Sequence, residues 1–220
     1  MLIQNRCQQL CPVLNKGCIY KFKENTEGIY LVLNKRKILL MNKLKTFDYF
    51  NKVANTWLED LEEKNEEDII INPFEGSWSI SELYDHIMKV ARTYQIPNFK
   101  KSVTTEVERK KRKNIKGLVI FNVGIKKINL KVKMENFPKP LVKDFTPIKQ
   151  NKTELIKDFK QFINEVNSLK ETLLKSKKKN KHYHPMFGDI NTKDWFTLIA
   201  FHMAHHEKQK KRINEFLESR

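Results

Sequence analysis

The last apolar-patterned stretch of the chain contains two histidines, His202 and His206, at a spacing of four residues. In a helix, at about 100° per residue, they fall about 40° apart, on the face that carries the apolar side chains and one turn from each other. Two imidazoles placed in this way can share one metal ion, as the paired histidines of zinc metalloprotease helices do. Without a partner, each buried imidazole would cost about 1 to 3 kcal/mol. A single inward histidine is more often a core residue, but this pair predicts a metal site. His205 falls at the edge of the same face and is the weaker candidate.

A third ligand has to come from another helix, and His86 is the only histidine in the second apolar-patterned segment. It lies on the flank of the stripe that this segment would bury. His182 and His184 precede the last helix in an expected loop, where we predict exposure to solvent. The predicted metal ligands are therefore His86, His202 and His206.

Three neutral imidazoles on a divalent ion leave one to three coordination positions open, as is typical of catalytic sites. Zn, Ni, Fe(II) and Mn all remain compatible with such a set of ligands. Glu82, Tyr84 and Asp85 lie near the predicted site. Each also has a structural explanation: a helix cap, a packing aromatic and a surface charge. Asp85 would either accept a ring N–H from a metal-bound histidine or face water, and we predict water. No catalytic residue or general base is assigned.

Four amphipathic segments would position these histidines. The first has apolar residues every three or four positions from Phe47 to Leu61. The second begins at a capping box formed by Ser79 and Glu82, and Pro97 is expected to end it. The third has a strict apolar repeat at Leu155, Phe159, Phe162, Val166, Leu169 and Leu173. The fourth follows Asn191 or Thr192, both suitable N-caps. Four such helices predict an all-α four-helix bundle.

Two regions are harder to interpret. Residues 99–150 form a long crossover between the second and third helices. Its apolar run GLVIFNVGI and Lys-alternating run KKINLKVK are compatible with a hairpin or an irregular helix. Residues 1–40 contain all three cysteines, Cys7, Cys11 and Cys18. Met41 is a candidate start of the protein. The alternative is a genuine N-terminal extension in which Gly28 to Leu40 forms a short hairpin. The bundle domain would then occupy residues 41–220.

Composition restricts the functional classes. The net charge of +17 is compatible with nucleic-acid binding, but only seven of the 43 basic residues are arginine. Phosphate and base recognition favour the guanidinium fork, so nucleic-acid binding is disfavoured. No apolar run reaches the roughly 18 residues of a membrane span, and no secretory signal pattern is present. The three cysteines all lie in the first eighteen residues, so disulfides between them cannot cross-link the rest of the fold. Such unpaired thiols fit a reducing compartment. We therefore expect a cytoplasmic protein with no membrane partner.

Three segments together resemble the DinB-like superfamily, particularly its YfiT-type members: SWSISELYDHI, HPMFGDINTKDW and HMAHHEKQ. The resemblance covers most of residues 41–220. It implies a metal-dependent four-helix bundle with His86, His202 and His206 as ligands. It also implies that residues 184–188 form the family's His-Pro-x-Phe-Gly turn, with Trp195 at the helix entry. Frequent homodimers, and reactions that use low-molecular-weight thiols such as bacillithiol, mycothiol or glutathione, are implied as well.

The leading hypothesis is a metal-dependent enzyme that acts on a small-molecule substrate. A bound ion lowers the pKa of a thiol or of water and so could activate either as a nucleophile. A thiol-dependent S-transferase ranks first and a hydrolase second. A non-catalytic bundle stabilised by metal and a basic nucleic-acid-binding protein are the alternatives.

Overall fold

The computed structural model describes the backbone of residues 16–105, 111–123 and 143–220, and in these ranges the side chains from residue 37 onward except that of residue 123. The chain separates into two units, Met1–Asn42 and Lys43–Arg220. The helices predicted to form the bundle, and the three candidate histidines, belong to the second unit. Whether residues 1–40 are an extension of the native protein stays a prediction.

Helix α2 spans Lys16–Glu63. The expected apolar stripe is confirmed, because Phe47, Phe50, Ala54, Trp57 and Leu61 are all buried. The alternative of a hairpin over residues 28–40 is wrong, since this segment is helical throughout. An uninterrupted helix pairs every backbone group of the segment within itself, whereas a two-stranded hairpin would leave outer edges unpaired.

The second helical segment begins with α3, Ile80–Val90, and its predicted capping box is present: the Ser79 side chain accepts the Glu82 N–H, and the Glu82 carboxylate accepts the Ser79 N–H. The expectation that Pro97 ends this segment is wrong. A π-helical turn, η2, covers Ala91–Gln95, and helix α4 continues over Ile96–Thr104. Proline lacks an N–H and clashes with the preceding turn of a regular α-helix. The wider π turn comes just before Pro97, which then occupies the first turn of α4, where its missing donor costs little.

The crossover contains helix α5, Ile115–Val123. Of the alternatives for the apolar run 117–125, the helix is confirmed as far as residue 123. The Lys-alternating run 126–133 lies outside the described residues. The α5 segment is fixed beside the later hairpin, because Asn114 N–H donates to the Phe187 carbonyl at 3.0 Å and the Phe121 and Phe187 rings meet edge to face.

The third predicted helix consists of α7, Lys152–Asn167, and α8, Lys170–Lys175. All six residues of its predicted repeat are buried. A short antiparallel hairpin follows, with strand β1 at Lys181–His184 and strand β2 at Gly188–Asn191. His184 is therefore not in an exposed loop as expected. It is 6% exposed, because its ring packs against Phe187 and Trp195.

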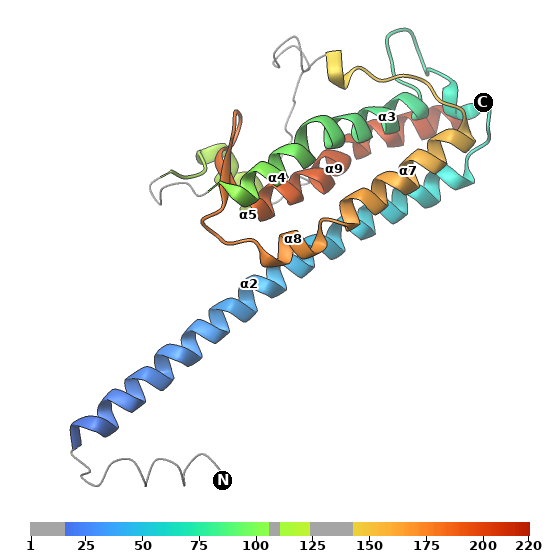
Figure 1. Cartoon of the computed structure of the whole chain (residues 1–220). Helices are drawn as coiled ribbons and strands as arrows, with labels where there is room; N and C mark the ends of the chain where they lie inside the picture. Colours follow the sequence, from blue (N-terminus) through green and yellow to red (C-terminus); the bar gives the residue numbers. More distant parts are fainter. Residues whose placement is uncertain (1–15, 106–110, 124–142) are drawn as a thin grey trace. The chain divides into compact units, whose positions relative to one another are not determined.

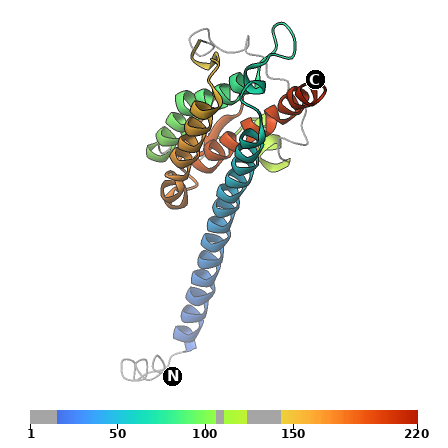
Figure 2. The same cartoon turned by 90° about the vertical axis from the view of Figure 1, so that its right-hand side faces the viewer.

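Helix α9, Thr192–Glu218, is the fourth predicted helix, and Asn191 is its N-cap. Figure 1 shows the four helical segments of the second unit: α2 from Lys43 onward, α3–α4, α7–α8 and α9. They enclose one core rich in aromatic residues. Edge-to-face contacts of the Phe50 ring with Phe162 and Phe196 link three of these segments. Figure 2 shows the same helices seen from a second side. The predicted four-helix bundle with a long crossover is confirmed. Among the described helices, none has the length and apolar character needed to cross a membrane.

Candidate metal centre

The structure brings His86, His202 and His206 together from two helices. One nitrogen of each ring can be chosen so that all three atoms lie within 4.8 Å of one another. The His202 and His206 Nε2 atoms are 3.1 Å apart, and the centroid of the His86 ring is 5.1 Å from each of the other two rings. His86 comes from α3, whereas His202 and His206 occupy successive turns of α9. The helical spacing thus places the pair, and packing of α3 against α9 adds the third ring.

Hydrogen bonds assign the proton on two of the rings. His86 Nδ1 lies 3.0 Å from the Phe145 carbonyl oxygen, which can only accept. His206 Nδ1 lies 2.9 Å from Gln209 Oε1. Both Nδ1 atoms therefore carry the proton, and both Nε2 atoms present a lone pair. Metal-binding histidines commonly have this arrangement, in which the second nitrogen donates to an oxygen and fixes the ring.

Burial keeps these histidines neutral. Burial, together with a smaller effect of the neighbouring His86, lowers the pKa of His206 to about 3. Desolvation also lowers the pKa of His202 well below its usual value, with additional effects of His206 and His86, and it lowers the pKa of His86. Only a neutral imidazole can bind a metal ion, so no proton has to be displaced at neutral pH.

The arrangement fits a divalent ion. Two nitrogens on a tetrahedral zinc ion with bonds of about 2.0 to 2.1 Å are about 3.4 Å apart, and they are at most about 4.2 Å apart in any geometry. The 3.1 Å between His202 and His206 is close to the first value. The three atoms lie within 4.8 Å of one another, which is more than 4.2 Å, so at least one ring has to move for all three to bind one ion. His202 is the least constrained of the three candidate ligands, because its buried Nδ1 contacts no hydrogen-bond partner in the described part of the chain.

The surroundings differ from the sequence interpretation in three respects. Asp85 does not face water, since it is only 4% exposed, and its carboxylate accepts bonds from residues 148 and 150 of the crossover. Trp78, just before α3, was not predicted as a site residue, yet its ring lies 4.7 Å from that of His86 and stacks on His206 at 6.2 Å. The Phe145 carbonyl was also missed. A backbone oxygen has no sequence signature, whereas Trp78 was visible in the SWSISE motif.

The other acidic and phenolic candidates have structural roles. Glu82 caps α3, which confirms the structural explanation for this residue. The Tyr84 hydroxyl donates to the Trp57 carbonyl at 2.6 Å, and its ring packs on Trp57 and Phe159. His205 lies beside His206, with ring centroids 5.0 Å apart, but is not a member of the three-histidine group. Within the described residues, that group includes no carboxylate and no thiol.

Comparison with known proteins places this geometry in a family. The model of the DinB superfamily matches residues 47–209, nearly three quarters of the chain. The chain belongs to the DinB superfamily. The matched segment begins in α2, ends in α9 and includes all three histidines of the group.

Two solved structures resemble this DinB protein. One is TT2238, described as a four-helix bundle protein, with 16% identity, a TM-score of 0.40, and coverage of 79% of this chain and 98% of that one. The other is YfiT from Bacillus subtilis, described as a probable metal-dependent hydrolase with an unusual four-helix bundle topology. It has 15% identity, a TM-score of 0.41, and coverage of 79% and 86%. No curated protein matches in sequence.

Proposed function

We propose that His86, His202 and His206 hold one divalent metal ion, and that this DinB protein is an enzyme whose nucleophile binds at that ion. The observation that carries the proposal is the convergence of three neutral imidazoles, two of which have their Nε2 lone pair fixed by hydrogen bonds at Nδ1. A divalent ion with open positions lowers the pKa of a thiol or water bound to it.

The nearby carboxylates favour a thiol over water as the nucleophile. Asp85 binds the crossover, Glu82 caps α3, and Glu207 accepts the Trp57 indole N–H at 2.8 Å. All three are thus directed to other partners, and none is placed as a general base toward the group. Hydrolysis generally needs such a base to remove protons from water, whereas a thiol has a usual pKa near 8.5 and loses its single proton on coordination. We therefore propose a low-molecular-weight-thiol-dependent S-transferase.

The side chains around the group would define where the two substrates bind. His86 is buried, whereas His202 and His206 are half-buried, so access to the group lies along α9. Trp78 covers His86 and stacks on His206, which provides an apolar wall beside the nucleophile. An electrophile with an apolar or aromatic body would pack on this wall and keep water away from the reacting sulfur.

Metal binding is tested first. Protein purified without an affinity tag should contain about one divalent ion per chain by elemental analysis, and the ion present identifies the native metal. The variant with His86→Ala, His202→Ala and His206→Ala should contain less than about a tenth of that amount. Equal metal content in the two proteins would contradict the metal site.

Catalysis is tested on the metal-loaded protein with electrophiles and a panel of cellular thiols. We expect thiol conjugation that disappears after chelation and returns when metal is restored. Metal-dependent hydrolysis without thiol would replace the transferase by a hydrolase. Absence of both reactions in metal-loaded protein would favour a bundle in which the metal only stabilises the fold.

A further inference from the structure

The last part of the crossover, residues 145–150, runs along α3 and is here called the strap. Its backbone is attached to that helix at several points. The Ser81 hydroxyl and the backbone of Gln150 bond to each other in both directions, at 2.7 and 2.9 Å. The Lys89 ammonium donates to the Thr146 carbonyl at 3.0 Å, and the Phe145 carbonyl faces His86 Nδ1. The strap is therefore in direct contact with one of the three candidate ligands.

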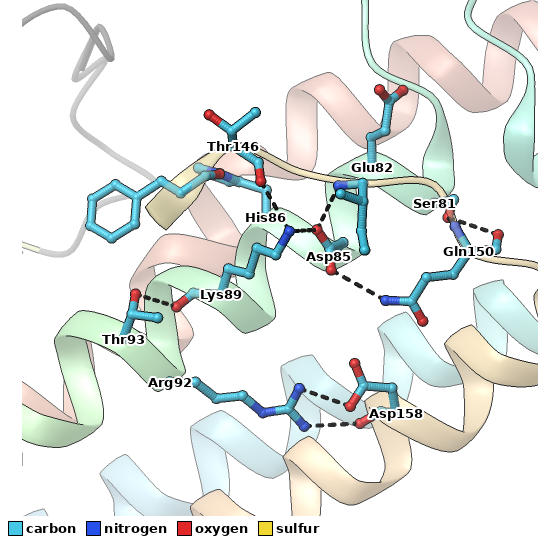
Figure 3. A network of polar contacts seen from close by, with 12 residues as sticks. Ser81, Glu82, Asp85, His86, Lys89, Arg92, Thr93, Thr146, Gln150 and Asp158 are labelled. Carbon is cyan, nitrogen blue, oxygen red and sulfur yellow. Dashed lines mark hydrogen bonds and ion pairs between the residues drawn. The ribbon is translucent and has the colours of Figure 1, made fainter. Parts of the chain in front are cut away.

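Asp85 is at the centre of these contacts (Figure 3). Its Oδ2 accepts the Ile148 backbone N–H at 2.8 Å and also pairs with Lys89 at 2.8 Å. Its Oδ1 accepts the Gln150 side-chain amide at 3.2 Å. Both carboxylate oxygens are thus occupied by the strap or by the lysine that binds it. A buried carboxylate is costly unless it is paired in this way.

The strap in turn fixes the state of His86. Because the Phe145 carbonyl only accepts hydrogen bonds, His86 must carry its proton on Nδ1 to bond with it, which leaves Nε2 as a lone pair. If the strap moved away, the neutral ring could hold its proton on either nitrogen. The ring with its proton on Nε2 has no lone pair at that nitrogen with which to bind a metal ion.

We propose that Asp85 is a positioning residue for the metal centre: it anchors the strap so that the Phe145 carbonyl holds His86 in the Nδ1–H form. Asp85 touches neither His202 nor His206 in any described contact, and it acts on His86 through the strap. The tautomer part of this proposal stands on the strap contacts alone. Its consequence for metal affinity rests on the proposed function.

The first experiment measures the His86 tautomer in metal-free protein by long-range ¹H–¹⁵N NMR. Asp85→Asn keeps the side-chain volume but replaces one acceptor oxygen with a donor. We expect the wild-type ring to be predominantly Nδ1–H and the variant to show a mixture of tautomers. Asp158→Asn is the matched control. Asp158 lies on α7 and pairs at 2.8 Å with Arg92, which lies further along the helical segment that contains Asp85 and away from the strap (Figure 3). It should leave the His86 tautomer unchanged.

A compensating variant separates positioning from general loss of structure. In Asp85→Asn combined with Gln150→Glu, the donor and acceptor of one contact are exchanged, and the Ile148 N–H can still donate to the amide oxygen of the substituted side chain. The double variant should restore the Nδ1–H form.

Metal affinity provides the second measurement. Zn²⁺ titration in competition with a chelator should show affinity about 10- to 100-fold weaker in Asp85→Asn, as is usual for residues that support ligands, and near wild type in Asp158→Asn. An unchanged His86 tautomer in Asp85→Asn, an equal change in Asp158→Asn, or no recovery in the double variant would overturn the proposal. If wild-type protein binds no metal while the tautomer responds as expected, the proposed function fails and the anchoring of the strap stands.

Discussion

The Nε2 atoms of His202 and His206 face each other at 3.1 Å across one turn of α9. Two neutral rings at this distance share one proton, because the His206 Nδ1–H donates to Gln209 and its Nε2 must accept. His202 then donates from Nε2, and its buried Nδ1 has no partner among the described residues. A cation bound by both Nε2 atoms would take the place of this hydrogen bond, with the His202 proton on Nδ1 instead.

Removal of either His202 or His206 should therefore reduce metal binding, whereas removal of the neighbouring His205 should not. His202→Ala and His206→Ala are each expected to lower bound metal to less than about a tenth of the wild-type amount, because two imidazoles hold a divalent ion much more weakly than three. His205→Ala, on the same helix but outside the three-histidine group, should keep nearly all of it. Elemental analysis of dialysed protein gives the three values. Equal loss in the His205 variant would contradict the assignment.

Gln209 should tune metal affinity through His206. In Gln209→Leu, the His206 Nδ1–H loses its acceptor at 2.9 Å, so the ring is no longer fixed with its Nε2 toward the ion. We expect affinity for Zn²⁺ to fall by about 10- to 100-fold, as is usual when a partner of a metal-binding imidazole is removed. Gln209→Glu keeps an acceptor and should retain or increase the affinity. Chelator competition measures both variants, and equal affinities of the Leu and Glu variants would show that the contact has no influence.

Gly188 should be required where the hairpin packs against the segment that precedes α5. It has φ of 73°, and a Cβ there would lie 2.8 Å from the Asn114 nitrogen and 2.9 Å from the Arg112 oxygen. Gly188→Ala is expected to lower the free energy of unfolding by about 2 to 4 kcal/mol, from the left-handed backbone and the clash together.

Gly76→Ala is the matched control for the hairpin glycine. Gly76 has a similar φ of 76°, but nothing lies within 4 Å of the position that a Cβ would occupy. The substitution should cost only about 1 to 2 kcal/mol, the conformational part of the effect. Urea unfolding monitored by circular dichroism measures both. A cost for Gly188→Ala no larger than that for Gly76→Ala would contradict the close approach.

His184 should make stability depend on pH. Burial lowers its pKa to about 4, and its Nδ1 accepts the Met186 N–H at 3.1 Å, a bond that protonation would break. In the unfolded chain the pKa is about 6.5. Between these two pH values the unfolded state binds more protons than the folded state. The contribution of His184 to the free energy of unfolding is therefore fully present above pH 6.5 and decreases as the pH falls toward 4. The loss is about 3 kcal/mol.

His184→Asn isolates this effect, because Asn keeps an acceptor for the Met186 N–H but does not titrate. The variant loses ring packing against Phe187 and Trp195 and should be less stable at pH 7. The difference from wild type should then shrink by about 3 kcal/mol by pH 4. Urea unfolding of metal-free proteins across this range provides the test, and parallel pH curves would refute the role of His184.

The sequence by itself determined the helices of the bundle and two of the three histidines at the centre. Periodicity identifies Phe47, Phe159 and their equivalents because each helix has one buried face, and the spacing of four residues places His202 and His206 on adjacent turns whatever packs around them. The capping box at Ser79 and the N-cap at Asn191 were local signals as well, since each depends on residues close together in the chain.

Only the tertiary structure decided the rest. The approach of His86 to the α9 pair, the burial of Asp85 and His184, and the Phe145 carbonyl at His86 all join positions far apart in the chain. The prediction at Pro97 was wrong for a related reason: proline disfavours a regular helix locally, but a preceding π turn lets the segment continue along the core. Periodicity reports which face of a helix is buried. It does not report which groups from other segments meet that face, and those groups set the protonation and orientation of the histidines.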